Sequence, residues 1–398
     1  MTSPSRWLTT EQAAQVLGVK AATVYAYVSR GQLTRHPGPD RRSSRFERAE
    51  VERLAARSRH GGRAGALDVV LDTELTRLDP AGRLHYRGRD ATALADEPFE
   101  RVAEWLWAAD PGEWRTEERL STVVRAVQAA LPTDTRPADR FRVALAALPG
   151  TDPFRYDRRP AAVAAAGRAL IAALVDGLPR RGEPYDGSVA ARLLAGCADR
   201  TPTPEQVRTV DAALVLAADH ELAASALAAR VAASVRADPY LTVLAGLAAL
   251  GGELHGGTVG AAEAVLAELA AGRPVPELLA ARSSAGTPGF GHAVYTGPDP
   301  RAEAVLDRLA ASTDGPVLAG RLAELVAAVG RHDGPRPNFD LALGALSVEY
   351  GLAPGSAEAI FVLGRCAGLI GHTIEEYRHR FRFRPRAVYT GPEPSTSD

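Results

Sequence analysis

A short glycine-rich stretch carries the residues best suited to chemistry. Residues 289–301 read Gly-Phe-Gly-His-Ala-Val-Tyr-Thr-Gly-Pro-Asp-Pro-Arg, and the glycines and prolines exclude a continuous helix through the middle. His292 on such a backbone can approach a ligand and move a proton, and Arg301, nine residues later, supplies a permanent cation. The pair would suit acid–base chemistry on an anionic substrate. A turn with a surface histidine and a helix-capping Asp-Pro explains this stretch equally well, so the rest of the chain must decide.

Four more polar side chains stand in an otherwise apolar, alanine-rich background. His220 lies within Ala-Asp-His-Glu-Leu, and His255 is bracketed by two pairs of glycines. Asp340 follows a proline-rich loop and opens a helical pattern, whereas Arg365 stands inside an apolar helical pattern, where a guanidinium needs a buried anionic partner. Each has a simpler structural alternative: a histidine paired with a neighbouring carboxylate, a turn residue, a helix N-cap and a structural ion pair. Taken singly, these alternatives are favoured for His220 and Asp340.

The elements that would position these groups are mainly helices. Apolar residues recur at three- and four-residue spacing between prolines and glycines. The helices predicted from this spacing are residues 99–109, 117–131, 141–148, 161–178, 189–198 and 204–217. One hairpin is predicted before them, with strands in residues 69–78 and 84–88 and a turn at 79–82. The sequence contains neither a GxGxxG after a strand nor a P-loop, so a Rossmann or nucleotide-hydrolysing enzyme has no support.

Composition limits the classes of protein to which the chain can belong. A chain of 398 residues with 46% hydrophobic and 24% charged residues is expected to form two or three globular domains. The two cysteines, Cys197 and Cys366, are far apart, which fits a cytoplasmic protein and argues against a zinc site or a disulfide framework. No apolar run approaches about 20 residues, so we expect no signal peptide, no membrane span and no membrane partner.

The N-terminal segment is basic and the remainder is acidic. Residues 1–65 contain Lys20 and eleven arginines against five acidic residues, a formal charge of +7, whereas the remainder carries −8. Such a basic segment is expected to meet a polyanion. Within it, a helix is predicted from a cap at Thr9 or Thr10 to Gly18, and a second helix over residues 21–30. An arginine-rich polar turn and a third predicted helix, residues 49–58, follow.

This segment resembles the small winged helix-turn-helix modules of excisionase and MerR-type regulators. The resemblance implies that residues 1–60 form a DNA-binding domain, joined to the body by a linker at 61–65. Its second helix would read DNA and its arginine-rich turn would lie on phosphates, two copies being needed for useful affinity. The candidate DNA-binding residues are Thr23, Tyr25, Arg30, Arg41, Arg42 and Arg45. A module that only docks a partner protein is the alternative.

Six motifs in the body, taken in order, resemble the citrate synthase family from about residue 66 to the C-terminus. They are Asp-His-Glu at 219–221, Leu-His-Gly-Gly at 254–257, Gly-Phe-Gly-His at 289–292 with Asp-Pro-Arg at 299–301, Pro-Asn-Phe-Asp at 337–340, Gly-Arg-x-Ala-Gly at 364–368 and Arg-Pro-Arg-x-x-Tyr-Thr-Gly at 384–391. The resemblance implies a mainly α fold: an all-helical homodimer with a large domain (66–255 and 347–398) and a small domain (256–346), preceded by the winged helix-turn-helix. The glycines around His255 suit a hinge.

The resemblance also implies an activity, the condensation of acetyl-CoA with oxaloacetate to citrate and CoA in the tricarboxylic acid cycle. Acetyl-CoA is then a co-substrate, and no metal or organic cofactor is required. Asp340 would remove a methyl proton, and neutral His255 would donate a hydrogen bond to the thioester oxygen. His292 would polarise and protonate the ketone of oxaloacetate. The substrate-binding residues would be His220, Arg301, Arg365 and Arg384, the last reaching the site of the partner subunit.

The chain departs from the family around the substrates. Alanines occupy two positions beside oxaloacetate, Ala217 and Ala223, where many members have a histidine and an asparagine. Basic residues that meet CoA phosphates are absent after His292, and Arg336 or Arg282 would have to replace them. We therefore keep two alternatives open: a 2-methylcitrate synthase that uses propionyl-CoA, and a metabolite-sensing transcription regulator built on a citrate synthase body. The presence of both catalytic imidazoles and of Asp340 favours an enzyme.

Overall fold

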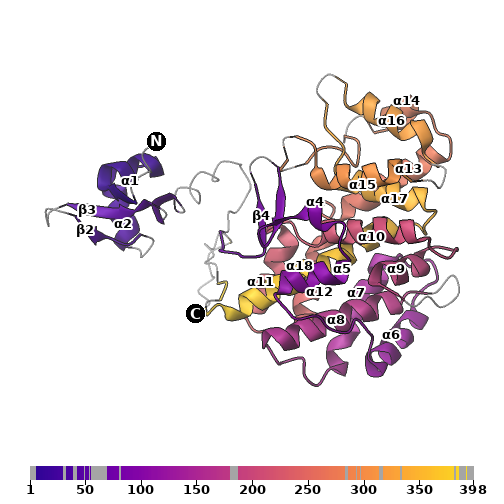
Figure 1. The fold of residues 1–398 in the computed structure, drawn as a ribbon, viewed down its shortest axis with the longest axis horizontal. Helices are drawn as coiled ribbons and strands as arrows, with labels where there is room; N and C mark the ends of the chain where they lie inside the picture. Colours follow the sequence, from indigo (N-terminus) through magenta and orange to yellow (C-terminus); the bar gives the residue numbers. More distant parts are fainter. Residues whose placement is uncertain are drawn as a thin grey trace, which may run out of the picture. The chain divides into compact units, whose positions relative to one another are not determined.

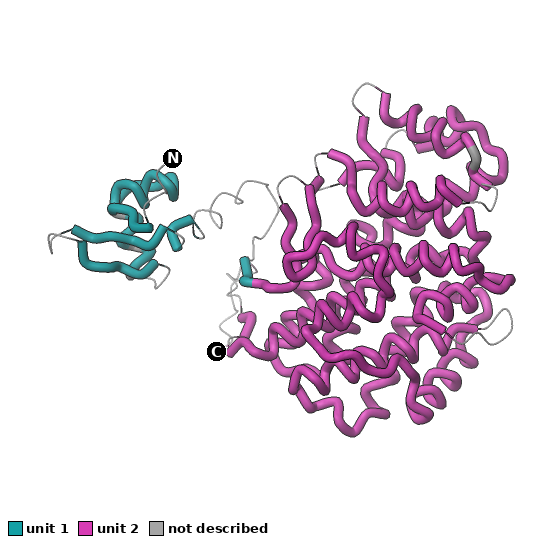
Figure 2. The backbone as a smooth tube through the Cα atoms, in the orientation of Figure 1, with its two compact units in different colours: residues 1–72 teal, residues 73–398 magenta. Residues whose placement is uncertain are grey.

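The computed structural model describes residues 6–29, 33–38, 43–48, 50–52, 54, 70–79, 82–179, 187–282, 286–292, 294–295, 297–312, 317–331, 334–380, 382–384 and 391. The chain divides into two compact units, unit 1 (residues 1–72) and unit 2 (residues 73–398), which Figure 2 shows in different colours. The predicted linker at 61–65 lies outside the described residues.

Unit 1 has the predicted helix-turn-helix with a small sheet. Its elements are β1 (Trp7–Thr9), α1 (Thr10–Leu17), α2 (Ala21–Ser29), β2 (His36–Pro37) and β3 (Ser44–Glu47). Thr9, rather than Thr10, caps α1: its hydroxyl accepts from the N–H of Gln12, whose side chain accepts from the Thr9 N–H in return. The helix ends at Gly18, whose left-handed φ of 67° closes the turn into α2.

The sheet of unit 1 is antiparallel, in the order β1-β3-β2, and β2 and β3 form the expected wing. Leu8, Val24 and Phe46 are buried between the sheet and the two helices. In the predicted third helix, the described residues 50–52 and 54 are helical, and so is residue 48. The rest of that predicted helix and the tip of the wing lie outside the described residues.

Unit 2 opens with the predicted hairpin and is otherwise helical (Figure 1). The hairpin strands β4 (Thr76–Leu78) and β5 (Leu84–Tyr86) pair as expected, and β6 (Arg89–Asp90) adds a third strand. The first helices are α4 (Ala91–Leu94), α5 (Phe99–Trp107), α6 (Glu118–Ala130), α7 (Pro137–Ala147), the 3-10 helix η1 (Leu148–Thr151), α8 (Pro160–Asp176), α9 (Val189–Cys197) and α10 (Pro204–Ala217). The later ones are α11 (Ala224–Ser234), α12 (Pro239–Leu250), α13 (Gly257–Ala270), α14 (Val275–Ala280), α15 (Pro300–Ala310), α16 (Ala319–Val329), α17 (Phe339–Glu349) and α18 (Ser356–Arg378).

The predicted helices agree with these bounds within about two residues, except for α7. It begins at Pro137, four residues before the predicted start at 141, because Pro137 occupies the first turn, where a missing N–H is tolerated. The predicted bounds of α10 match, since Thr203 and Gln206 form a capping box at its start.

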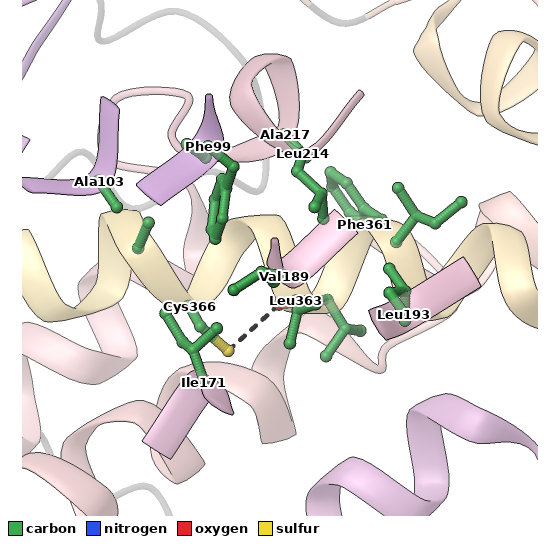
Figure 3. Packing of buried hydrophobic residues seen from close by; sticks show 14 of the residues in the cluster. Phe99, Ala103, Ile171, Val189, Leu193, Leu214, Ala217, Phe361, Leu363 and Cys366 are labelled. Carbon is green, nitrogen blue, oxygen red and sulfur yellow. Dashed lines mark hydrogen bonds between the residues drawn. The ribbon is translucent and has the colours of Figure 1, made fainter. Parts of the chain in front are cut away.

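The long helix α18 is the centre of the larger core. Helices α5, α7, α8, α10, α11, α12, α13 and α17 contact it. In Figure 3, side chains such as Phe99, Ile171, Leu193 and Leu214 surround Leu363 and Cys366. Among the described residues, α18 is the one helix long and apolar enough to cross a membrane, but that segment is wholly buried within the unit. The helix therefore serves as the core on which other helices pack.

A second hydrophobic core is drawn entirely from residues 265–345. Its buried members are Val265, Leu266, Leu269, Val275, Leu278, Leu318, Leu325, Leu341 and Ala345. They come from α13, α14, α16 and α17, with Leu318 just before α16. Figure 1 shows α14 and α16 at one end of unit 2 and α6 and α8 at the other.

Glycines on α18 allow it to approach α10 closely. A Cβ added to Gly368 would lie 2.2 Å from the carbonyl oxygen of Ala218, and the Gly368 N–H donates to that oxygen at 3.0 Å. We expect Gly368→Ala to destabilise unit 2 by about 3 kcal/mol, because a backbone atom would have to move. The check is the urea unfolding midpoint of the full chain, followed by tryptophan fluorescence.

Gly320→Ala is the matched control, since a Cβ at Gly320, on α16, would meet nothing within 4 Å. Its unfolding free energy should stay within about 1 kcal/mol of that of the unsubstituted chain. An unchanged midpoint for Gly368→Ala would show that α10 moves aside freely, against the close packing described above.

Candidate active site

The loop that carries His292 is tied to the loop that precedes Asp340. The backbone N–H of Asn338 donates to Gly289 O at 2.9 Å, and its Nδ2 donates to Gly291 O at 2.8 Å. The same side chain caps α17, since Oδ1 accepts from Asp340 N at 3.0 Å. Gly289 has a φ of 89°, and an added Cβ would lie 2.9 Å from a side chain of α17. This amide therefore fixes the imidazole and the carboxylate relative to each other.

Backbone hydrogen bonds fix the tautomer of His292. Its Nδ1 accepts from the N–H groups of Val294 at 3.0 Å and Tyr295 at 3.2 Å, so the proton of the neutral ring is on Nε2. Burial, and next the charge of Arg301, lower the pKa of His292 to about 4. Nε2 lies 3.4 Å from Arg301 Nη2, which is also a donor. Two donors side by side define a place for an acceptor oxygen of a ligand.

Arg301 is a buried cation with a fixed orientation. Its Nε and Nη2 donate to the two oxygens of Asp299 at 3.0 and 2.8 Å, a bidentate pair. Its guanidinium carbon lies 5.6 Å from the ring of Tyr295 and 4.9 Å from that of Phe339. Asp299 also caps α15, through the Arg301 N–H at 3.0 Å. The Asp299 carboxylate thus has two roles: it caps the helix, as the sequence pattern Asp-Pro suggested, and it pairs with Arg301.

His220 completes a cluster of three rings. Its Nε2 lies 2.9 Å from the hydroxyl of Tyr295, and its ring centroid lies 5.2 Å from that of His292. The ring of Tyr295 lies 4.6 Å from that of His292. Burial, and next the charges of Arg301 and Arg365, hold the pKa of His220 well below its usual value. Both histidines are therefore neutral at physiological pH and can donate without carrying charge.

Arg365 is buried without a carboxylate partner. It is 1% exposed, and its Nε donates to Ala217 O at 2.9 Å. Its Nη1 is buried with no hydrogen-bond partner among the described residues, and burial lowers the pKa of Arg365 against the opposing charge of Asp219. Its guanidinium carbon lies 5.0 Å from the ring of Phe361. Because an unpaired buried charge is costly, this arginine is poised for an anion.

His255 and Asp340 lie close together, since the hydroxyl of Thr258 contacts both residues. The Nε2 of His255 is 2.9 Å from Ser225 Oγ, and its ring centroid is 6.5 Å from that of Phe361. Burial, and next the charge of Arg365, lower the pKa of His255 to about 4. Burial raises the pKa of Asp340, against the opposing effects of a hydroxyl hydrogen bond and of Arg301. A neutral imidazole donor and a carboxylate of raised basicity thus share one site.

The fold brings together six of the seven residues predicted to be catalytic or substrate-binding. His220, His255, His292, Arg301, Asp340 and Arg365 gather in one place. Arg384 does not join them within this chain: it is exposed, and the adjacent Phe383 N–H donates to Ser234 Oγ, at the end of α11 remote from the site. Ser225, at the near end, lies nine residues away along α11, or about 14 Å.

The structure adds residues that sequence reasoning missed. Tyr295, Asp299 and Ser225 each contact a predicted site residue, at 2.9, 2.8 and 2.9 Å respectively. Asp299 could have been found from its place two residues before Arg301. The contacts of Tyr295 and Ser225 join segments that are 75 and 30 residues apart, and local sequence patterns do not signal such contacts.

A buried network behind the site was also missed. His372 Nε2 lies 3.1 Å from Asp219 Oδ1, and Arg230 Nε donates to His372 Nδ1 at 2.9 Å. Thr76 Oγ1 donates to Asp219 Oδ2 at 2.5 Å, and Tyr86 Oη donates to the Asp219 carbonyl at 3.1 Å. These bonds fix the residue immediately before His220.

A cavity of about 350 Å³ opens beside His292, between the loops at 291–299 and 334–337, and Arg336 lines it. A larger cavity, of about 870 Å³, lies elsewhere in unit 2, around Asp176 and Arg192. In that cavity Arg192 Nη1 already donates to Asp176 at 2.9 Å, whereas the smaller cavity is lined by His292, so we assign the chemistry to the smaller cavity and the adjoining charged groups. Within the described ranges, no three His, Cys, Asp or Glu side chains cluster as a metal site would require.

In unit 1, the described DNA-binding candidates lie on the expected elements. Tyr25 on α2 is 44% exposed, and Thr23 on the same helix is half-buried. Arg45 on β3 stacks over Trp7, with its guanidinium carbon 4.6 Å from the ring. The other three candidates, Arg30, Arg41 and Arg42, lie outside the described residues.

Comparison with known proteins identifies both parts of the chain. Residues 67–386 match the family "Citrate synthase, C-terminal domain", and residues 7–59 match the family "Helix-turn-helix domain". A citrate synthase from Saccharolobus solfataricus is 34% identical over 82% of this chain and 94% of its own length. A 2-methylcitrate synthase from Mycobacterium tuberculosis is 29% identical over 83% of this chain and 90% of its own length.

Solved structures agree on the fold. Citrate synthase from Thermoplasma acidophilum, in a ternary complex with carboxymethyl coenzyme A and oxaloacetate, has a TM-score of 0.62 and 24% identity. The match covers 83% of this chain and 96% of that one. The site geometry, the family match over most of unit 2 and the 34% identical relative lead to one conclusion. The chain belongs to the citrate synthase family and carries an N-terminal helix-turn-helix domain.

Proposed function

We propose that unit 2 condenses acetyl-CoA with oxaloacetate and releases citrate and CoA. The observation that carries this proposal is Arg365, buried without a carboxylate beside neutral histidines and a carboxyl group of raised pKa. An anionic 2-oxo acid supplies the charge that Arg365 lacks. The membership of the citrate synthase family supports an enzyme that joins an acyl-CoA to such an acid.

Oxaloacetate binding uses the two buried guanidinium groups. Arg301 and Arg365 bind its carboxylates, and His220 donates a further hydrogen bond to the same molecule. The ketone oxygen occupies the position that faces His292 Nε2–H, next to Arg301 Nη2. His292 polarises this carbonyl and protonates the alkoxide that forms when carbon attacks it.

Acetyl-CoA activation uses Asp340 and His255. Asp340 removes a proton from the methyl group while His255, with Nε2 accepting from Ser225 Oγ, donates from Nδ1 to the thioester oxygen. The resulting enol(ate) carbon attacks the ketone of oxaloacetate and forms the carbon–carbon bond. Water then hydrolyses the thioester, which releases CoA and leaves a new carboxylate.

The CoA moiety is proposed to lie in the 350 Å³ cavity. Arg282 is already bound to Glu268 Oε1 at 2.5 Å and to Leu278 O at 3.1 Å. Arg336 is exposed and lines the cavity, so we assign to Arg336 the contact with a CoA phosphate. Acetyl-CoA is the proposed substrate, since no observation favours the longer propionyl chain.

We propose a homodimer in which each subunit completes the site of the other. Exposed apolar side chains support such an interface; they include Phe154 (74%), Tyr156 (61%), Val235 (60%) and Leu241 (43%). Phe383, next to Arg384, is bonded to the end of α11 beside Val235. We therefore assign Arg384 to the partner subunit's oxaloacetate site.

The second hydrophobic core supports a division of unit 2 into two domains. We propose that residues 256–346 form the small domain and that 66–255 and 347–398 form the large domain. The core drawn from residues 265–345 supports this division. The sequence contains two cysteines, Cys197 and Cys366, both buried and far apart in the chain, which supports a cytoplasmic location.

The activity is tested by CoA release from acetyl-CoA and oxaloacetate. The unsubstituted chain should release CoA, and Asp340→Asn should lower kcat about 1,000-fold because the amide cannot accept the methyl proton. Calorimetry should show oxaloacetate binding largely unchanged in this variant. Asp307→Asn, an exposed aspartate on α15, is the control and should keep full activity. CoA release that survives Asp340→Asn would remove the base from the mechanism.

We also propose that unit 1 binds duplex DNA through α2 and the wing. The match to the helix-turn-helix family and the formal charge of +7 over residues 1–65 support this proposal. The guanidinium carbons of Arg6 and Arg45 lie 5.5 and 4.6 Å from the centroid of the Trp7 ring, and Arg6 also pairs with Glu47 at 3.1 Å. A metabolite-sensing regulator would combine this activity with substrate binding by unit 2.

DNA binding is tested by titrating a mixed-sequence duplex with the full chain between about 50 and about 200 mM salt. We expect affinity to fall steeply as salt rises, and Arg45→Gln to lower the slope of log affinity against log salt by about 1. Arg83→Gln, an exposed arginine of the unit 2 hairpin, should leave the slope unchanged. Equal slopes for all three proteins would eliminate Arg45 as a phosphate contact, and absence of binding would eliminate the function.

A further inference from the structure

One hydroxyl group joins the proposed base to the backbone of the proposed thioester donor. Thr258 lies on α13, and its Oγ1 is 2.7 Å from Asp340 Oδ2 and 2.7 Å from the carbonyl oxygen of His255. A threonine hydroxyl has one proton, so it can donate fully to one of these acceptors at a time. The other oxygen of the carboxylate, Oδ1, receives no hydrogen bond from the described residues.

The packing of two helices sets these distances. The α13 and α17 helices cross closely, since a Cβ added to Gly344 would lie 3.0 Å from the backbone nitrogen of Glu263. Thr258 is β-branched and so has restricted rotation about χ1. Asp340 follows the N-cap Asn338, whose Oδ1 accepts from its N–H at 3.0 Å. Neither group can leave the other without disturbing the helix pair.

We propose that Thr258 is a positioning residue that holds Asp340 by Oδ2 and leaves Oδ1 as the oxygen that takes the substrate proton. The proposal rests on the proposed function, in which Asp340 is the base. A hydrogen bond to one oxygen restricts rotation of the carboxylate about its terminal bond, so the lone pairs of the free oxygen favour one direction. No substrate contact of Thr258 itself is required.

The hydroxyl of Thr258 changes its hydrogen-bond acceptor when Asp340 takes up the proton. While Asp340 is ionised, the hydroxyl donates to Oδ2, because a charged acceptor is the stronger one. When the carbon–hydrogen bond of the methyl group breaks, its electron pair stays on carbon and the proton moves to Oδ1. Asp340 is then neutral and Oδ2 is a weaker acceptor, so the hydroxyl hydrogen turns to the His255 carbonyl. The proton returns to solvent or product from Oδ1, and none passes through Thr258.

Thr258 donates a direct hydrogen bond to Asp340 and so lowers the pKa of this carboxyl group. Burial raises the pKa of the carboxyl group, and Asp299 raises it further, whereas Thr258 and Arg301 lower it. Glu263 of α13 is turned away, since Oε1 accepts from Ser347 Oγ and Oε2 from the Gly355 N–H at 2.8 Å. From α18, Arg365 donates to Ala217 O instead, and His255 meets Asp340 only through Thr258.

The test compares pH profiles of CoA release for the unsubstituted chain, Thr258→Val and Thr258→Ser. Valine keeps the shape and removes the donor, so the pKa of Asp340 should rise and the acid limb of kcat should move to higher pH. At a pH well below the midpoint of that limb, the ratio of kcat to its plateau value should be about tenfold lower in Thr258→Val than in the unsubstituted chain. The plateau value of kcat should itself be about tenfold lower, because the carboxylate is less well oriented. KM for oxaloacetate should stay within about twofold, and Thr258→Ser should restore the limb and most of the plateau.

Thr122→Val is the matched control, because its hydroxyl contacts Glu118 and Arg125 on the surface of α6, away from the site. An acid limb that is the same in Thr258→Val and the unsubstituted chain overturns the proposal, as does failure of Thr258→Ser to restore it. Thermal melting and circular dichroism show whether Thr258→Val is folded; if it is not, Thr258→Ala replaces it.

A second measurement separates this proposal from the proposed function. The ¹³Cγ shift of Asp340, assigned with Asp340→Asn, is titrated in the resting protein without substrates. A higher midpoint in Thr258→Val supports the hydrogen bond even if no CoA is released, an outcome that would refute the citrate synthase activity alone. An unchanged midpoint refutes the role of Thr258 even if the enzyme is active.

Discussion

Positive charge that is buried without full compensation is the constraint on which this site depends. Arg301 has Asp299 as a bidentate partner, whereas Arg365 lies against the Phe361 ring and, in the described part of the chain, donates only to a backbone carbonyl. An unpaired buried guanidinium costs several kcal/mol, which the surrounding core must offset. The same charges, after burial, lower the pKa values of the nearby histidines and keep their rings neutral. The site is thus prepared for a dianion and for neutral donors by a single electrostatic arrangement.

The long helix α18 can carry this buried charge because the helices of the larger core pack around it. Arg365 lies on it, and His372, two turns later, is bonded to Asp219 and to Arg230. Arg230 is in turn paired with Glu376 at 3.1 Å. This buried polar network fixes the loop before His220 from behind, although Glu376 Oε1 has no hydrogen-bond partner among the described residues. The binding side of the site is therefore anchored in the larger core.

Local features of the sequence predicted most of the fold and named six residues that the fold brings together, because helix caps, prolines and glycine pairs act over a few residues. The capping box at the start of α10 and the glycines beside His255 are examples. Tyr295 and Thr258 had no such signal. Their contacts cross 75 and 82 residues and exist only once helices have packed. The α7 start was predicted too late, since Pro137 was taken as a boundary instead of a first helical residue.

The site is divided between the two proposed domains, and this division has a mechanical consequence. His292, Arg301 and Asp340 lie in the segment 256–346, where Asn338 ties their loops together. His220, His255 and Arg365 lie outside that segment, on α18 and on the loops beside α11 and α12. A dianion bound by Arg301 and Arg365 contacts both domains at once, so its binding energy favours the arrangement in which they meet. In the proposed reaction, the base Asp340 and the thioester donor His255 belong to different proposed domains. Binding of the 2-oxo acid first would therefore bring these two groups together before the thioester arrives.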